Sequence, residues 1–445
     1  MKFENAVARF RQGTLTPREY LEQCIAIIDE KEPRIRAFSH LDIERARRQA
    51  DASTKRYELR APVSAIDGMP IGIKDIIDIA TQPTGMGSEI YRGWTPLCSA
   101  EAVDALNNQG AVILGKTQST EFAIGRATIT TNPYDVNRTP GGSSSGTAAG
   151  VSSGMFCAGL GTQTQGSIIR PASYCGVVGF KPTWGALPLR GTHPVSYSHD
   201  HLGVIAQTVD IAWSLAQCIM QYRPNAINIK INGRSSLDTD AFASPRIAVL
   251  RTSGLNELNC TELAAFDDCV NQYRRLGINI SDSVDDPALR DLCRALDDIP
   301  AASAEMVASD MLWPYDQYCK TFTDRVSEKI HDMVARGKQI TPQRYHALRD
   351  RKAQILEQLT NLSDRYDIFL LPSSSGIAPL GLENTGSRTL AVYASYLGIP
   401  AVSLPATVID GMPMGLQLLS TPFSDYELMC RAKYLFDSLQ KRNLQ

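Results

Sequence analysis

Two glycine- and serine-rich loops, separated by a short apolar stretch, constrain this chain more than any other feature of its sequence. The first, 139–146, reads TPGGSSSG, and the second, 161–171, reads GTQTQGSIIRP. Glycine lets a backbone turn sharply and lets successive N–H groups converge on one point, which is the geometry that an oxyanion hole requires. Loops of this composition also occur as ordinary flexible turns, so either loop alone leaves both interpretations open.

A lysine stands inside an apolar run upstream of these loops. Residues 71–77 read IGIKDII, with Lys74 at the centre. Lysine is rarely buried, so Lys74 could extend from a strand end or pair with Asp75 or Asp78. A catalytic lysine would instead have to be neutral near pH 7, and an apolar neighbourhood favours that state by lowering its pKa.

Taken in this order, the lysine run and the two loops resemble the amidase signature. The resemblance is strong from Asp67 to about Pro182 and weaker at 398–405 and 411–417. It implies an α/β amidase signature fold with a large central mixed β-sheet covered by α-helices on both sides. It also implies a hydrolase that cleaves a small amide without a metal or an organic cofactor.

The resemblance assigns a role to each of three catalytic residues. Ser167 is the expected nucleophile, Ser143 the bridging serine and Lys74 the base, with a cis peptide bond between Gly142 and Ser143. A serine hydroxyl needs a neighbouring base to become nucleophilic, and Ser–Lys arrangements are one established solution. Ser143 would relay the proton from Ser167 and later deliver one to the departing amine, by way of an acyl-enzyme.

The backbone around the nucleophile is expected to bind the developing oxyanion. The candidate N–H donors immediately precede and include the nucleophile: Thr164, Gln165, Gly166 and Ser167. Thr162, which we group with the substrate-binding residues, would orient this loop through hydrogen bonds of its side chain. A purely structural threonine is an equal alternative.

Arg170, three residues beyond the nucleophile, is the best clue to the substrate. Arginine binds carboxylates through a planar, two-pronged array of donors. The stretch 83–94, together with SIIRP, is most similar to malonamidase-type enzymes, in which the corresponding arginine holds the substrate carboxylate. We therefore expect a short amide with a carboxylate, such as malonamate. The alternative is that Arg170 braces the loop through carbonyl groups or an acidic partner.

Other substrates remain open within the same family. The A subunits of amidotransferases share the signature, but in those compared the arginine follows the nucleophile by two residues, whereas Ile168 and Ile169 separate Ser167 from Arg170 here. This spacing favours a free-standing amidase. A urea-like or guanylurea-like C–N bond is a further possibility for this fold.

Different protein classes also compete. GSSSG at 142–146 could be the nucleophile elbow of an α/β-hydrolase, with Ser144 as nucleophile. A metal site could be formed by His193, His199 and His201, although loop histidines of this kind are more often solvent-facing. A catalytically silent binding protein is the remaining alternative, against which the presence of all three catalytic residues argues.

Alternating strand and helix patterns indicate an α/β sheet. We expect a single domain over 1–445, since no internal repeat or low-complexity linker divides the chain. We expect a helical N-terminal arm (1–60), a Gly/Ser-rich catalytic core (62–210), a peripheral helical segment (257–362) and C-terminal strands with a helix (366–445). Strand patterns occur at Ile71–Ile73, Val112–Gly115, Phe156–Leu160, Val177–Phe180, Ile368–Leu371, Ala401–Leu404 and Met414–Leu419. The last two would form a hairpin across Asp410 and Gly411.

Composition restricts the partners. The net charge is only −2 with 21% charged residues, which argues against nucleic acid and favours a small molecule as the partner.

No apolar run reaches the roughly 18 residues that span a membrane, and no leader-like start is present, so we expect no membrane partner and a cytoplasmic protein. The ten cysteines form no C-x-x-C pair, which indicates reduced, mostly buried thiols. The family resemblance suggests a homodimer.

Overall fold

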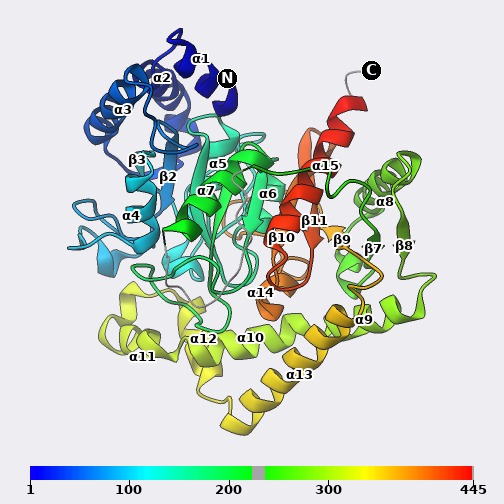
Figure 1. Cartoon of the computed structure of the whole chain (residues 1–445). Coiled ribbons are helices and arrows are strands. Elements are labelled where there is room, and N and C mark those ends of the chain that lie inside the picture. The colour runs from blue at the N-terminus through cyan, green and yellow to red at the C-terminus, as the bar shows by residue number, and fades with distance from the viewer. Residues whose placement is uncertain (223–235, 443–445) are drawn as a thin grey trace.

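The computed structural model describes residues 1–222 and 236–442. Within them, one mixed sheet of eleven strands forms the centre of the molecule (Figure 1). The strands are β1 (Phe38–Leu41), β2 (Pro70–Lys74), β3 (Val112–Thr117), β4 (Ala158–Gln163), β5 (Val178–Lys181), β6 (His201–Ala206), β7 (Ile247–Val249), β8 (Ile280–Asp282), β9 (Ile368–Pro372), β10 (Ala401–Ile409) and β11 (Met412–Leu419). Their order across the sheet is β1-β3-β2-β4-β6-β5-β10-β11-β9-β7-β8.

Helices surround this sheet. They are α1 (Phe3–Gln12), α2 (Pro17–Ile35), α3 (Ile43–Glu58), α4 (Glu101–Asn108), α5 (Ser145–Ser152), α6 (Ile169–Tyr174), α7 (Val209–Gln221), α8 (Cys260–Arg275), α9 (Pro287–Asp297), α10 (Ile299–Asp310), α11 (Leu312–Thr321), α12 (Glu328–Gly337), α13 (Pro342–Asn361), α14 (Tyr393–Leu397) and α15 (Asp425–Arg442). Short 3₁₀ helices occur at Glu89–Tyr91, Glu121–Ala123, Ser253–Glu257 and Thr323–Arg325.

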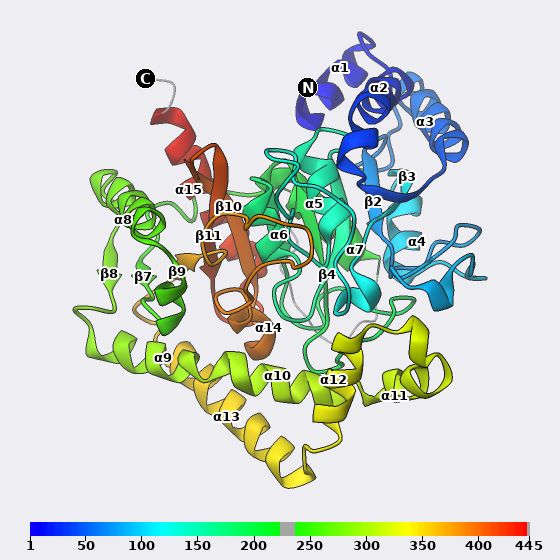
Figure 2. The same ribbon diagram turned by 180° about the vertical axis from the view of Figure 1, so that it is seen from behind.

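Both faces of the central strands are buried, because helices cover each of them. Along β6, Val204 and Ala206 belong to the hydrophobic cluster that includes α7, while Ile205 between them belongs to the cluster that includes α5. Successive side chains of a strand point to opposite faces, so this alternation places α5 and α7 on opposite sides of the sheet. The expected fold class is therefore confirmed (Figure 2).

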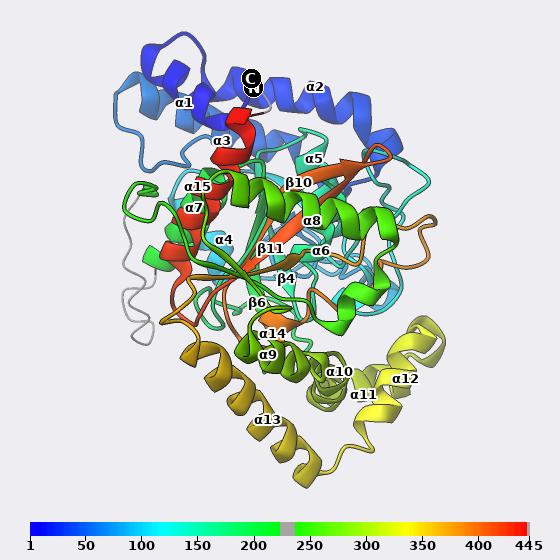
Figure 3. The same ribbon diagram turned by 90° about the vertical axis from the view of Figure 1, so that its right-hand side faces the viewer.

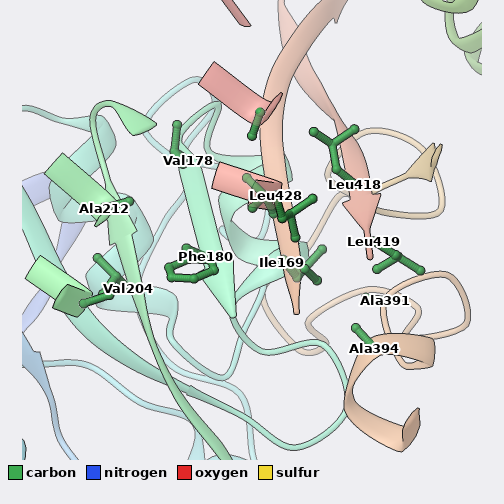
Figure 4. Packing of buried hydrophobic residues seen from close by; sticks show 14 of the residues in the cluster. Ile169, Val178, Phe180, Val204, Ala212, Ala391, Ala394, Leu418, Leu419 and Leu428 are labelled. Carbon is green, nitrogen blue, oxygen red and sulfur yellow. The ribbon is translucent and has the colours of Figure 1, made fainter. Parts of the chain in front are cut away.

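The larger cluster joins the two halves of the chain. Phe180 of β5 and Val204 of β6 lie beside Ala212 of α7, and the same cluster includes Leu428 of α15 (Figure 4). Phe180 is fully buried. Burial of such side chains contributes roughly 1.5–3 kcal/mol each and holds β5 and β6 against α7.

The N-terminal arm is helical, as expected, but it also contributes a strand. Thr16 caps α2 in a capping box with Glu19, and Pro17 occupies the first helical position. Between α2 and α3, however, β1 pairs with β3 at the edge of the sheet. The expectation of a helical arm at 1–60 did not include this strand, because a strand of four residues is too short to show a clear alternation of apolar and polar side chains.

The peripheral segment is a layer of helices on one side of the molecule. Helices α9 to α13 lie together at the bottom of Figure 1 and project beyond the sheet in Figure 3. The segment 257–362 also includes β8, which pairs with β7 at the far edge of the sheet and was not expected from the sequence. The segment thus adds the edge strand β8 to the sheet, and its helices α9 to α13 lie below the sheet in the view of Figure 1.

Most of the predicted strands are confirmed, and one central strand was missed. The hairpin of β10 and β11 turns across Asp410 and Gly411, as the sequence predicts. β4 begins at Ala158, two residues later than expected. β6 was not predicted, although it pairs with both β4 and β5, because its HLGVIA sequence begins with a histidine and contains a glycine.

Two further expectations concern membrane spans and cysteines. None of the helices in the described part of the chain is both long and apolar enough to cross a membrane. All ten cysteines are free thiols; Cys98 and Cys260 are exposed and the other eight are buried.

We expect Phe180→Ala to lower the free energy of unfolding by about 3–5 kcal/mol, because truncation of a fully buried aromatic side chain leaves a cavity in the cluster shared by β5, α7 and α15. Urea titration measures this change. Leu59→Ala, at a side chain that is 78% exposed, is the control and should stay within about 0.5 kcal/mol. Equal, small losses for both variants would contradict the packing argument.

Candidate active site

The sheet topology brings the predicted catalytic residues to one place. β2 and β4 are parallel neighbours, with Ile73 opposite Leu160, so their carboxyl ends lie at the same edge of the sheet. Lys74 is the last residue of β2, and Gln163 is the last residue of β4. The loop after β4 carries Ser167.

The bridging serine reaches this edge from the first Gly/Ser loop. Ser143 stands two residues before α5, which packs on β2 and β4. The peptide bond between Gly142 and Ser143 is cis, as the family resemblance implies. The carbonyl of Ser143 accepts a hydrogen bond from the amide of Thr120 at 3.3 Å, which ties the loop to the segment after β3.

Lys74 is fully buried and has three oxygen neighbours. Its Nζ lies 2.6 Å from the Oγ of Ser143, 2.7 Å from the Oγ1 of Thr162 and 3.4 Å from the carbonyl oxygen of Thr162. No carboxylate forms an ion pair with it among the described residues. Thr162 thus has a role that the sequence indicated only in general terms: it holds the lysine rather than lining the pocket.

Burial decides the charge of this lysine. Desolvation lowers the pKa of Lys74 well below its ordinary value of 10.5, and the distant charge of Asp200 offsets only part of this effect. A neutral amine has two N–H donors and one lone pair. Two neighbours of Lys74, the hydroxyl and the carbonyl of Thr162, can accept those N–H groups. The lone pair then faces Ser143, which is the arrangement that a base requires.

The nucleophile loop has unused backbone donors. Among the described residues, no hydrogen bond is recorded from the amides of residues 164–167, whereas the amides of Ile168 and Ile169 both donate to the side-chain oxygen of Gln163. The backbone of Gly166 has φ of 151°, and a Cβ there would lie 2.8 Å from Ala391. The expected oxyanion donors are therefore free to bind a ligand, and the loop needs glycine at its tightest point.

Gln163 was missed by the sequence analysis, and it organises this loop. Its side chain is fully buried, accepts the two amides after the nucleophile at 2.9 and 3.0 Å, and donates to the hydroxyl of Ser395 at 3.0 Å. The start of α6 is thereby fixed, with Ser167 two residues before it. Only its position as the last residue of a strand could have suggested such a role.

Asp200 is a second positioning residue that sequence reasoning missed. Its carboxylate accepts the hydroxyl of Thr164 at 2.7 Å and the amides of Val195 and Ser196 at 2.8 and 2.9 Å. Burial raises the pKa of Asp200 to about 6, although these three hydrogen bonds oppose the rise. Asp200 therefore links the oxyanion loop to the segment before β6.

The catalytic serines open into one small pocket of about 30 Å³. Its lining includes Ser143, Ser167, Thr164, Gln165, Arg170, Lys329 and Arg388. The remaining lining residues are neutral: Thr120, Ala123, Ile124, Gly125 and Thr385. Of the described residues, three cationic side chains and no carboxylate line the pocket. Two of these cations, Lys329 and Arg388, were not identified from the sequence.

Arg170 lines this pocket and is only 2% exposed. Its guanidinium donates to the carbonyl of Gly142 at 2.5 Å, to Thr385 Oγ1 at 3.0 Å and to the carbonyl of Ser387 at 3.2 Å. Burial lowers its pKa to about 10. These contacts are the bracing arrangement that we considered as an alternative; substrate binding by Arg170 stays a prediction.

Comparison with known proteins decides the family. The family model described as amidase matches residues 19–429, which is most of the chain. The chain belongs to the amidase family. The A subunit of glutamyl-tRNA(Gln) amidotransferase from Chloroflexus aggregans is 31% identical over 452 aligned positions, covering 94% of this chain and 92% of that protein.

Solved structures of amidase-family proteins have the same architecture. A crystal structure of an amidase superimposes with a TM-score of 0.86 at 26% identity and covers 99% of this chain and 100% of its own. A protein from work on a vestigial complex and the evolutionary origins of an s-triazine catabolic enzyme gives 0.84 at 27% identity, with 98% of each chain covered. Both likenesses extend across the whole fold.

The structure also shows the surroundings of the residues behind the two competing interpretations. These are Ser144 for an α/β-hydrolase, and His193, His199 and His201 for a metal site. Ser144 is fully buried, donates to the carbonyl of Thr162 and does not line the pocket. His193 contacts the hydroxyl of Tyr318 at 3.1 Å. His199 and His201 are buried, so the expectation of solvent-facing histidines was wrong for these two. In the described part of the chain, no three His, Cys, Asp or Glu side chains lie close enough to hold a metal ion.

We expect kcat/KM to rise with pH and then level off, because Lys74 accepts a proton only when it is neutral. The apparent pKa of this rise should lie well below 10.5, since burial lowers the pKa of Lys74. A pH–rate profile on any substrate measures it. A rise centred at the ordinary lysine pKa would contradict a desolvated base.

Asp200→Asn tests which group causes that rise. Removal of the negative charge lowers the pKa of Lys74 further, so the rise should move to lower pH, while kcat should fall by about 10- to 100-fold because Thr164 loses its carboxylate acceptor. Asp350→Asn, at an exposed carboxylate on α13, is the control. Disappearance of the rise in Asp200→Asn would assign it instead to Asp200, whose own pKa is about 6.

Proposed function

We propose that this protein hydrolyses a small amide to a carboxylate and ammonia, through an acyl-enzyme on Ser167. The observation that carries the proposal is the fully buried Lys74, which lies 2.6 Å from Ser143 while Ser143 and Ser167 line one pocket. A neutral lysine, a relay hydroxyl and a nucleophile hydroxyl in this order are the groups that acyl transfer needs.

In the proposed reaction, Ser167 Oγ attacks the amide carbon and passes its proton to Ser143, which passes its own to Lys74. The amides of residues 164–167 stabilise the oxyanion in a site where no protein acceptor competes for them among the described residues. The proton returns through Ser143 to the departing ammonia. Water then attacks the acyl-enzyme by the same route and frees the carboxylic acid.

The charges of the pocket support a substrate with a carboxylate, such as malonamate. Arg170, Lys329 and Arg388 line the pocket, and no acidic side chain lines it in the part of the chain that the structure describes. Mutual repulsion of unpaired cations disfavours an empty site and is relieved by a bound anion. The small volume of the pocket, about 30 Å³, supports a short acyl group.

A subunit of the amidotransferase A type is the second candidate, because the relative from Chloroflexus aggregans is such a subunit by name and aligns over 94% of this chain. The spacing of Arg170, three residues after Ser167, is the sequence feature that favours the free-standing amidase over this candidate. Glutamine as the preferred ammonia source would favour this candidate. The s-triazine-related structure supports inclusion of urea-like compounds among the substrates tested.

We expect Ser167→Ala to reduce ammonia release from malonamate, malonamide, glutamine, a neutral aliphatic amide and a urea-like compound by at least about 10³-fold, because it removes the nucleophile. Ser153→Ala, at a buried hydroxyl without a hydrogen-bond partner among the described residues, is the matched control and should retain activity. Undiminished turnover in Ser167→Ala would overturn the mechanism. Failure of the wild type on every compound would favour the silent binding protein.

A further inference from the structure

A second cavity adjoins the catalytic pocket. It measures about 320 Å³, and the two cavities share three lining residues, Gln165, Lys329 and Arg388. Ala304, Ala308, Met333 and Ile340 line it together with the charged side chains of Glu305, Asp332 and Arg336. The shared residues therefore form the boundary between the small pocket of the two serines and a wider cavity.

Two cations stand at this boundary, from parts of the chain far apart in sequence. Arg388, in the segment between β9 and α14, donates a hydrogen bond to the side-chain oxygen of Gln165. Lys329, near the start of α12, contacts the carbonyl of Gly125 at 3.4 Å. Both side chains remain accessible to solvent, as groups that meet an incoming ligand must be.

Neither cation has a carboxylate partner in the part of the chain that the structure describes. Of the acids nearby, Glu121 accepts the amides of Arg126 and Ser327, and Glu305 pairs with Arg344 at 2.7 Å. Asp332, an exposed acid of α12, also lines the wider cavity but forms no ion pair with either cation among the described residues. Partial burial and the positive charges of Arg388 and Arg170 lower the pKa of Lys329 to about 8. An anion bound between Lys329 and Arg388 would supply the missing partner.

Arg170 is less suited to that role than these two residues. Its guanidinium already donates to three protein acceptors, and its Nε is buried without a partner among the described residues. A substrate carboxylate on Arg170 would have to replace contacts that hold the loop of Ser143. Arg388, by contrast, has one recorded hydrogen bond within the described chain, to the side chain of Gln165.

We propose that Arg388 and Lys329 bind the carboxylate of the substrate at the boundary of the two cavities, while Arg170 braces the catalytic loops. The proposal rests on the proposed amidase function and narrows its substrates to monoamides of short dicarboxylic acids. The amide carbon lies at Ser167, and the carboxylate end lies where the wider cavity supplies room that the catalytic pocket lacks. When the carboxylate binds, the hydrogen bond from Arg388 to the side chain of Gln165 breaks, and Arg388 donates to the carboxylate instead.

The kinetic test compares substrates that differ only in charge. For malonamate, succinamate and glutaramate, Arg388→Gln and Lys329→Gln should each lower kcat/KM by about 10- to 100-fold, mainly through KM, since each removes a charge-assisted contact. The corresponding neutral diamides should change less than about twofold. Arg388→Lys should recover part of the loss. Arg294→Gln, at an exposed arginine that pairs with Asp291 on α9, controls for loss of one positive charge.

A binding test separates this proposal from the proposed function. Malonate and succinate, titrated calorimetrically into Ser167→Ala protein, should bind, and Arg388→Gln in that background should weaken binding by at least about tenfold while malonamide shows no such change. Equal loss for dianions and neutral diamides, or no loss, would overturn the carboxylate site even if Ser167 proves to be the nucleophile. Dianion binding that depends on Arg388 in a protein without amidase activity would support the site and refute the reaction.

Discussion

The active site depends on one lysine that is buried without a counter-ion among the described residues. Lys74 and the buried Lys116 illustrate the difference. Lys116 lies 3.1 Å from the carboxylate of Asp75, whereas Lys74 faces only hydroxyl and carbonyl oxygens. A buried charge without a partner costs several kcal/mol, so burial without an ion pair lowers the pKa of Lys74 and favours its neutral form. The proposed role of base requires that neutral form.

The surrounding fold excludes water from Lys74 and holds its neighbours in place. All five residues of β2 are buried between β3 and β4, and α5 covers one face. Gln163 and Asp200 then fix the loop of the nucleophile through side-chain hydrogen bonds rather than through the sheet ladder. Such a loop can keep its own amides free, because other groups hold it in place.

The residues that could be predicted are those encoded by local sequence. Lys74, Ser143 and Ser167 stand in short motifs whose glycines and order along the chain are distinctive, and the strands around them have strong apolar patterns. Lys329 and Arg388 could not be found in this way, because they lie in polar segments 162 and 221 residues after Ser167 and meet it only through tertiary structure. β1 and β8 were missed because strands of four and three residues carry almost no periodicity.

Lys74 and the cations at the boundary of the two cavities, Lys329 and Arg388, respond to different charges. Asp200 is the charged group whose field acts on the pKa of Lys74, while Arg388 and Arg170 act on Lys329. If a carboxylate near Lys74 balanced the positive charge of the pocket, it would raise the pKa of the base and protonate it. An anion bound by Arg388 and Lys329 instead neutralises these two cations, while desolvation still sets the pKa of Lys74. In the proposed reaction, such a site would select an anionic substrate without raising the pKa of the proposed base.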